Sequence, residues 1–360
     1  MNAHQYTPLP IALTQGDAAG IGPEIIVKAF RDFPDVMRGC FVAGDVATLR
    51  RASGIVAGAS IALPVAELAD IAQAWFCPPR CVPVWTVPSS TTAPLVPLVP
   101  LGHVNAQAGR FAGDCVVWAT HAALHGEVCA VVTAPLNKAA LALAGEPYCA
   151  FPGHTELLQS LAAVHLKLPM SQVPVRMMLA NDELRVVLLS IHLSLHDALA
   201  AVTFENLLQT LLITHRSLRP LLDRDPRIGV AGLNPHAGEN GLFGTEERDI
   251  IAPAVEAARQ HGVLASGPFA PDTVFMRART KGSTPGEFDV VLAMYHDQGL
   301  IPVKYLGVER GVNVTLGLPL VRTSPDHGTA FDIAGTGWAD ASSFVEAVRV
   351  ARFISEHNVP

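Results

Sequence analysis

The chain has 360 residues, with 25 Lys and Arg against 32 Asp and Glu and a formal net charge of −7. Only 16% of the residues are charged and 50% are hydrophobic, whereas about 25% charged residues are usual in soluble domains. A negative net charge without a basic stripe argues against a nucleic-acid partner. The low charge indicates either contact with a membrane or surface that is covered by another subunit.

A membrane-spanning segment is not expected. No stretch approaches the roughly 18 uninterrupted apolar residues of a spanning helix, and the apolar segment at residues 92–104 is interrupted by Pro94, Pro97 and Pro100. The start of the chain lacks the Lys or Arg and long apolar core of a signal peptide. We therefore expect a cytoplasmic homo-oligomer. Its cysteines, expected to be reduced, are Cys40, Cys77, Cys81, Cys115, Cys129 and Cys149.

The order of the predicted elements is typical of an α/β protein. A short apolar strand, Ile11–Thr14, is followed by a glycine-rich loop and by helical spacing over residues 24–30, with Pro23 near the first turn. The strands are continuous apolar runs, which indicates a mostly parallel sheet buried on both faces. We expect further strands at residues 41–44, 129–133, 186–190, 228–233 and 289–294, helices at 109–125, 203–215, 246–261 and 341–355, and an irregular connector at 77–100.

Three histidines follow three separate predicted strands: His192, His236 and His296. Ligands of open α/β sheets bind beyond the carboxyl ends of the strands. Neutral imidazoles suit a borderline divalent cation, and three of them leave a position open for substrate. A single histidine at a strand end is more often a structural hydrogen-bonding group, so the pattern alone leaves both roles open.

A second group of polar residues is suited to an anion. Gly153, His154 and Thr155 precede a predicted helix, where backbone N–H groups and a hydroxyl can face an anion, although Thr155 can equally be a helix cap. Residues 133–138, which end in Asn137 and Lys138, form a similar loop after a strand. Lys304, Asn313 and Arg322 lie on short loops after the third histidine, and the two cations among them can hold phosphate or carboxylate.

Several common enzyme motifs are absent from the sequence. It has no G-x-G-x-x-G, no P-loop and no G-x-S-x-G elbow. Ordinary Rossmann dehydrogenases, P-loop enzymes and α/β-hydrolases are therefore disfavoured.

Longer sequence blocks resemble the 4-hydroxythreonine-4-phosphate dehydrogenase family of pyridoxal phosphate biosynthesis, over nearly the whole chain. The last block also resembles the nucleotide-binding loop of isocitrate and isopropylmalate dehydrogenases. The blocks are GDAAGIGPE at 16–24, PGHTE at 152–156, LNPHAGE at 233–239, GTEE at 244–247, MYHDQG at 294–299, GVNVTLGLP at 311–319 and RTSPDHGTAFDIAG at 322–335.

The resemblance implies a role for each site residue. His192, His236 and His296 occupy metal-ligand positions, completed across a homodimer interface, for Zn²⁺, Mg²⁺ or Co²⁺. His154, Thr155, Lys304, Asn313 and Arg322 occupy substrate-binding positions, and Lys304 and Asp297 catalytic ones. His327, Gly328, Thr329 and Asp332 would bind NAD or NADP.

The fold that the resemblance implies has two α/β lobes of the isocitrate dehydrogenase type, with the active site in the cleft between them. The first lobe would comprise residues 1–145 with 325–360, and the second, residues 146–324, would carry the metal ligands and the dimer interface. The implied reaction is a metal- and NAD-dependent oxidation of a small anionic hydroxy acid with decarboxylation.

Departures from the family blocks leave alternatives open. Pro152, Asn137 and the apolar Leu242-Phe243 replace residues common in the biosynthetic enzymes, so 4-phospho-threonate or -erythronate and a cis-dihydrodiol carboxylate stay open as substrates. A non-catalytic anion-binding protein on the same scaffold is the alternative of a different class.

Overall fold

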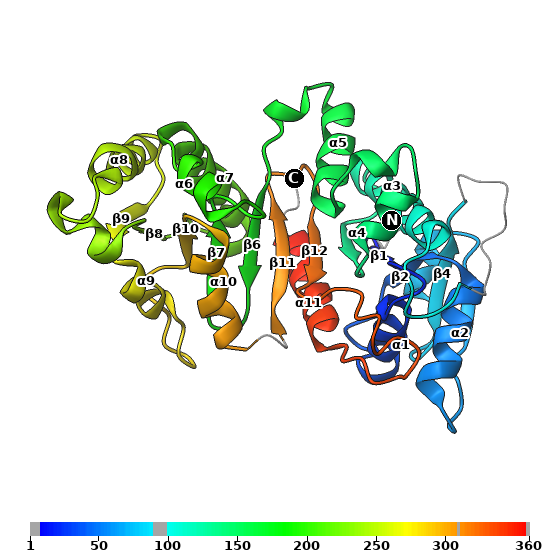
Figure 1. The fold of residues 1–360 in the computed structure, drawn as a ribbon. Coiled ribbons are helices and arrows are strands. Elements are labelled where there is room, and N and C mark those ends of the chain that lie inside the picture. The colour runs from blue at the N-terminus through cyan, green and yellow to red at the C-terminus, as the bar shows by residue number, and fades with distance from the viewer. Residues whose placement is uncertain (1–7, 89–98, 308–309, 358–360) are drawn as a thin grey trace, which may run out of the picture. The chain divides into compact units, whose positions relative to one another are not determined.

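The predicted α/β class is confirmed. The computed structural model describes residues 8–88, 99–307 and 310–357. The chain divides into two compact units (Figure 1), the first made of Met1–Val173 with Leu318–Ser355 and the second of Pro174–Gly317 with Glu356–Pro360. The unit boundaries therefore lie after Val173 and Gly317, whereas the sequence prediction placed them near residues 145 and 325.

The sheet of the first unit is parallel. Its strand order is β3-β4-β2-β1-β5-β12, and each neighbouring pair runs in parallel. Every residue of β1, β2, β5 and β12 is buried, as expected for strands covered on both faces. The strands are β1 (Ile11–Thr14), β2 (Cys40–Gly44), β3 (Val65–Glu67), β4 (Val82–Thr86), β5 (Ala130–Thr133) and β12 (Arg322–Pro325).

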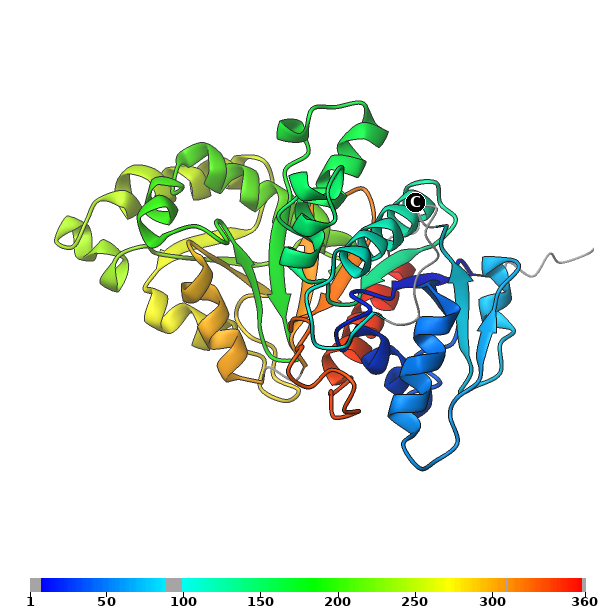
Figure 2. The same cartoon turned by 45° about the vertical axis from the view of Figure 1, so that its right-hand side comes forward.

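Helices from both parts of the chain belong to this unit. The C-terminal helix, red in Figures 1 and 2, is held against the loop at residues 36–38, because Arg352 donates to the carbonyls of Val36 and Arg38. One core cluster includes Phe41 and Phe111 beside partly buried aromatic rings. The helices are α1 (Gly22–Asp32), α2 (Val46–Ala57), α3 (Ala106–Leu124), α4 (Lys138–Leu143), α5 (His154–Leu166) and α11 (Ser342–His357).

The second unit has a mixed sheet. Its strand order is β11-β6-β7-β10-β8-β9; the two pairs at the β11 end are antiparallel and the rest are parallel. The strands are β6 (Arg176–Ala180), β7 (Arg185–Leu188), β8 (Ile228–Ala231), β9 (Ala265–Phe269), β10 (Val290–Ala293) and β11 (Val312–Leu316). The helices are α6 (Leu195–Ala200), α7 (Phe204–Leu222), α8 (Ala252–Gln260), α9 (Pro271–Ala278) and α10 (His296–Tyr305).

The prediction of an irregular connector at residues 77–100 is wrong for its first half. Strand β4 lies within it and pairs with β2 and β3. Proline is rare inside a sheet because it lacks the N–H donor, so Pro83 argued against a strand here. Residues 89–98 of the connector lie outside the described residues. Across the described part of the chain, no helix is long and apolar enough to cross a membrane.

Replacement of two helical glycines by alanine is expected to have opposite effects on the free energy of unfolding. A Cβ on Gly109 in α3 would overlap the backbone carbonyl of Ala140 in α4, whereas nothing lies within 4 Å of a Cβ on Gly54 in α2. We expect Gly109→Ala to lower the free energy of unfolding by about 1–3 kcal/mol. Gly54→Ala should raise it by roughly 0.5–1 kcal/mol. Urea unfolding of both variants measures this, and destabilisation of equal size in both would contradict it.

Candidate active site

The three predicted histidines follow three neighbouring strands of the second unit. Strand β10 lies between β7 and β8, and all three are parallel, so their carboxyl ends meet at one edge. Two hydrogen bonds tie the loops together there. Ser190 Oγ donates to the carbonyl of Met294 at 3.0 Å, and Gln298 Nε2 donates to the carbonyl of Gly232 at 2.8 Å.

Two of the three imidazoles lie close together. The ring centroids of His192 and His296 are 5.9 Å apart, whereas His236 packs edge-on against Phe243 at 6.2 Å. Among the described residues, no group of three His, Cys, Asp or Glu side chains is arranged to hold a metal ion. A single copy of the chain therefore brings together two of the predicted ligands and not the third.

Carboxylates orient two of these histidines. His296 Nδ1 lies 2.7 Å from Asp297 Oδ1, and His236 Nδ1 lies 3.1 Å from Glu239 Oε2. A carboxylate on Nδ1 leaves Nε2 to face a metal, an arrangement that is usual around bound zinc. The donor set thus fits a divalent cation. Asp297, predicted to be catalytic, contacts His296 and orients it.

The loop that carries His236 has an unusual backbone. Residues 236–240 all have positive φ, from 43° to 80°, although only Gly238 among them lacks a Cβ. Such conformations cost about 1–2 kcal/mol per ordinary residue and persist where surrounding contacts hold them. Glu247 supplies those contacts, since its Oε1 accepts from the backbone N–H groups of Leu233 and Asn234, both at 2.7 Å.

Glu247 is a residue whose role sequence reasoning missed. It was recognised only as part of the GTEE block, with no function assigned. Burial acts to raise the pKa of Glu247, but the hydrogen bonds that it accepts from Asn234 and Leu233 together lower the pKa below its usual value. Its burial shows only in the structure, so the GTEE block was the signal that the sequence offered.

A cationic cluster with a buried arginine lies in the first unit. Arg322 at the start of β12 is only 6% exposed and donates to Thr133 Oγ1 at 2.7 Å. His154 is the first residue of α5, and its Nε2 is buried without a hydrogen-bond partner among the described residues. Lys138, which is exposed, begins α4, close to the N-cap Gly153. Two of these side chains thus begin helices that follow β5, and the third is on β12, the parallel neighbour of β5.

The electrostatics of this cluster favour an anion. The pKa of His154 is lowered by burial first, and then by the charges of Arg322 and Lys138. Burial also lowers the pKa of Arg322 to about 10, against a smaller opposing effect of Glu156. The helix cap at α5 is Gly153, so the alternative role of Thr155 as the cap is excluded.

The other predicted substrate residues lie in the second unit. Lys304 is exposed in the last turn of α10, eight residues beyond His296, which is about 12 Å along the helix axis. Asn313 lies in β11 opposite Leu179 of β6. Neither is brought against the paired imidazoles by its own element.

The predicted cofactor residues follow β12 in the first unit. His327 has a buried Nε2 with no hydrogen-bond partner among the described residues, Thr329 is buried, and Asp332 is exposed. A residue near the N-terminus holds this segment, since Ile21 N–H donates to the carbonyl of Thr329 at 3.0 Å.

Asp17 is a further buried group that sequence reasoning placed only within a motif. It lies fully buried after β1, and its Oδ2 has no hydrogen-bond partner among the described residues. Burial raises its pKa to about 6, although the N–H groups of Ala19 and Asn137 act in the opposite direction. Neighbouring Thr14 and Gln15 are also fully buried, each with one polar atom that lacks a described partner.

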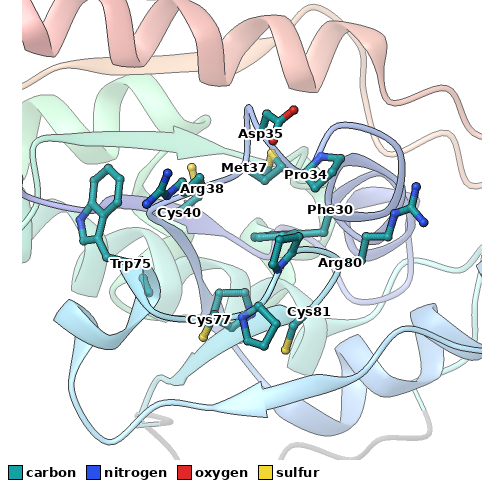
Figure 3. Close-up of a pocket in the computed structure, with 14 residues that line it drawn as sticks. Phe30, Pro34, Asp35, Met37, Arg38, Cys40, Trp75, Cys77, Arg80 and Cys81 are labelled. Carbon is teal, nitrogen blue, oxygen red and sulfur yellow. The ribbon is translucent and has the colours of Figure 1, made fainter.

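A cavity of about 320 Å³ in the first unit lies away from these residues (Figure 3). Its lining includes Cys40 at the start of β2 and Cys81 just before β4, so it opens at the amino ends of the strands. Cys40, Cys77 and Cys81 in its wall are free thiols. Because the candidate site residues follow the carboxyl ends of strands and this cavity lies at the amino ends, the cavity is separate from the candidate site.

Comparisons with known proteins agree with this arrangement. The family described as "Pyridoxal phosphate biosynthetic protein PdxA" matches residues 37–351. A 4-hydroxythreonine-4-phosphate dehydrogenase of Beijerinckia indica is 49% identical over 339 residues, which are 94% of this chain and 93% of the relative. A D-threonate 4-phosphate dehydrogenase of Salmonella typhimurium is 44% identical over 345 residues, 95% of this chain and 97% of the relative.

A solved structure is similar over the same length. The crystal structure of 4-hydroxythreonine-4-phosphate dehydrogenase from Klebsiella pneumoniae has a TM-score of 0.81 and 41% identity to this chain. The match covers 96% of this chain and 99% of the other.

The raised pKa of Asp17 predicts a pH-dependent stability. The folded state holds this proton up to about pH 6, whereas the unfolded chain releases it near pH 4. The contribution of Asp17 to the free energy of unfolding should therefore be largest below about pH 4 and fall by up to about 3 kcal/mol as the pH rises to 6. Asp17→Asn should remove this fall in urea unfolding across the range, whereas the exposed control Asp182→Asn should keep it. Parallel curves for the wild type and Asp17→Asn would contradict the assignment.

Proposed function

Because this chain belongs to the family of the pyridoxal phosphate biosynthetic protein PdxA, we propose that it oxidises 4-hydroxythreonine 4-phosphate with NAD and with loss of carbon dioxide. The observation that carries the proposal is the cationic cluster of Arg322, His154 and Lys138, in which the Arg322 side chain is buried. The carboxylate of Glu156 lies near this cluster. A phosphate would add negative charge beside the cationic side chains and accept hydrogen bonds from them.

The cofactor is assigned to the segment after β12. His327, Gly328, Thr329 and Asp332 are its predicted binding residues, and the exposed carboxylate of Asp332 is available to a ribose hydroxyl. A carboxylate that accepts from the 2′-hydroxyl repels a 2′-phosphate, which favours NAD over NADP.

The metal is assigned to the histidines of the second unit. A divalent cation bound to His192, His236 and His296 would polarise the substrate hydroxyl and the ketone that replaces it. Asp297 and Glu239 hold the rings of His296 and His236 with Nε2 outward.

The reaction balances with groups of this chain and the cofactor. The carbinol C–H leaves as hydride to the nicotinamide, and the hydroxyl proton goes to a base, for which Lys304 is the candidate. The resulting β-keto acid loses carbon dioxide, and the electrons of the broken C–C bond form an enolate that takes up a proton. Lys304 can return the proton that it accepted.

A homodimer completes the proposal. Exposed apolar side chains lie next to the histidines: Leu195 and Leu199 of α6 follow His192, and Leu242 and Phe243 follow the His236 turn. Exposed apolar patches of this kind mark interfaces between subunits. A second copy seated there would supply the third imidazole and cover the surface that the low charge content left unexplained.

The test is NAD reduction with three substrate classes in parallel. We expect turnover of 4-hydroxythreonine 4-phosphate, weaker turnover of D-threonate 4-phosphate and none of a cis-dihydrodiol carboxylate. A chelator should abolish the activity, and Zn²⁺, Mg²⁺ or Co²⁺ should restore it. Turnover of the dihydrodiol alone would establish the alternative dehydrogenase. Phosphate binding without NAD reduction by any substrate would leave the non-catalytic binding protein.

The dimer is tested by disrupting α6. Leu195 and Leu199 are 61% and 48% exposed on one helix face, so Leu195→Glu with Leu199→Glu should produce a monomer in sedimentation velocity. Zn²⁺ affinity, measured by calorimetry, should fall by about tenfold or more because a ligand is lost. Ile61→Glu, at a 94% exposed site of the first unit, is the control and should change neither quantity. A monomer that binds Zn²⁺ as tightly as the wild type would refute the shared site.

A further inference from the structure

Glu24 belongs to the glycine-rich block at residues 16–24, but neither the metal nor the substrate assignment uses it. It lies in the first turn of α1, and only 1% of it is exposed. Its Oε1 accepts from the backbone N–H of Gly335 at 2.6 Å, and its Oε2 accepts from the N–H of Gly337 at 2.9 Å. One buried carboxylate therefore closes a turn more than 300 residues further along the chain.

Two further contacts come from the same side of α1. Ile21 N–H donates to the carbonyl of Thr329 at 3.0 Å, and Lys28 Nζ donates to the carbonyl of Ala339 at 2.6 Å. Residues 21, 24 and 28 are three and four positions apart, which places them on one helix face. The segment from Thr329 to Ala339 is thus held at its start, middle and end by a single row of groups.

The turn requires a charged acceptor at its centre. Gly335 and Gly337 have φ of 85° and 71°, so their N–H groups point to one side and form a small anion-binding concavity. Hydrogen bonds from N–H to a carboxylate are about twice as strong as neutral ones. An amide at position 24 would accept from one of these N–H groups and present its own donors to the other.

Side-chain packing continues the same contact. Phe331, near the start of the segment, packs against Ala18, Ala19 and Ala108. A Cβ at Gly20 would lie 2.8 Å from the carbonyl of Thr329, so the loop before α1 touches the segment directly. The conformation of the segment is therefore set by the glycine-rich block at residues 16–24.

We propose that Glu24 is a positioning residue for the cofactor: it holds the segment after β12 in the conformation that binds the dinucleotide. The inference rests on the proposed function, which assigns His327, Gly328, Thr329 and Asp332 to NAD. Ordering the segment in advance lowers the entropic cost of binding the cofactor. Loss of the Glu24 contacts therefore weakens cofactor binding and leaves the reacting groups unchanged.

The test compares Glu24→Gln with Asp32→Asn, the same carboxylate-to-amide change on an exposed position of α1. Without ligand, hydrogen exchange of residues 329–339 should accelerate in Glu24→Gln and not in Asp32→Asn. The Kd for NAD by calorimetry and the KM for NAD should rise about tenfold or more, as expected when a buried donor loses a charged acceptor. The kcat at saturating NAD and the KM for the hydroxy acid should stay within about threefold, a split that a general loss of stability would not produce.

The outcomes separate this inference from the function on which it rests. Faster exchange with an unchanged Kd for NAD, or a fall in kcat equal to the rise in KM, would overturn the positioning role. A wild type that binds no nicotinamide dinucleotide would overturn the cofactor assignment and the inference together. If Glu24→Gln does not fold, Lys28→Met removes the outer contact to Ala339, and an unchanged KM for NAD in that variant would overturn the inference.

Discussion

A strand that is buried on both faces offers no solvent-facing position for a polar side chain, and most of this molecule follows from that constraint. Strands β1, β5, β8, β10 and β12 are entirely buried. Outside β12, whose Arg322, Thr323 and Ser324 are buried polar residues, these strands carry a polar side chain only at their last residue, if at all, so polar groups gather in the loops that follow. Parallel pairing collects the loops of neighbouring strands at one edge. The histidine loops of the second unit and the loop before Lys138 in the first are two results of the same rule.

The constraint also explains what the sequence could predict. The strand Ile11–Thr14 was predicted with its observed bounds, and β7, β8 and β10, which the three histidines follow, lie within or overlap the predicted strands. The family resemblance, read from short blocks, is confirmed over most of the chain. These features depend on local patterns, because a continuous apolar run and the polar residues that end it are adjacent in the sequence.

Features that depend on distant contacts could not be predicted in the same way. Strand β4 contains Pro83 and is stabilised by its two neighbours, so its own composition argued against it. The positive φ values around His236 are maintained by Glu247, eleven residues away, and nothing in Ala237 or Asn240 encodes them locally. Charges behave similarly. With 16% charged residues, the chain places several of them in its interior, among them Asp17, Glu24 and Arg322, where each has a specific electrostatic role.

The composition of the first unit has a consequence for biosynthesis. Its sheet takes β12 from residues 322–325, and Glu24 finds its hydrogen-bond donors at Gly335 and Gly337. A ribosome releases these residues only after residues 174–317, which carry every strand of the second unit, have been made. Strands β1 to β5 must therefore wait with the edge of β5 uncovered while the middle of the chain emerges, and contacts of such long sequence separation form slowly. The second unit, whose strands are contiguous in the sequence, is free to fold first, so the order of folding on the ribosome is the reverse of the order in which the two units begin.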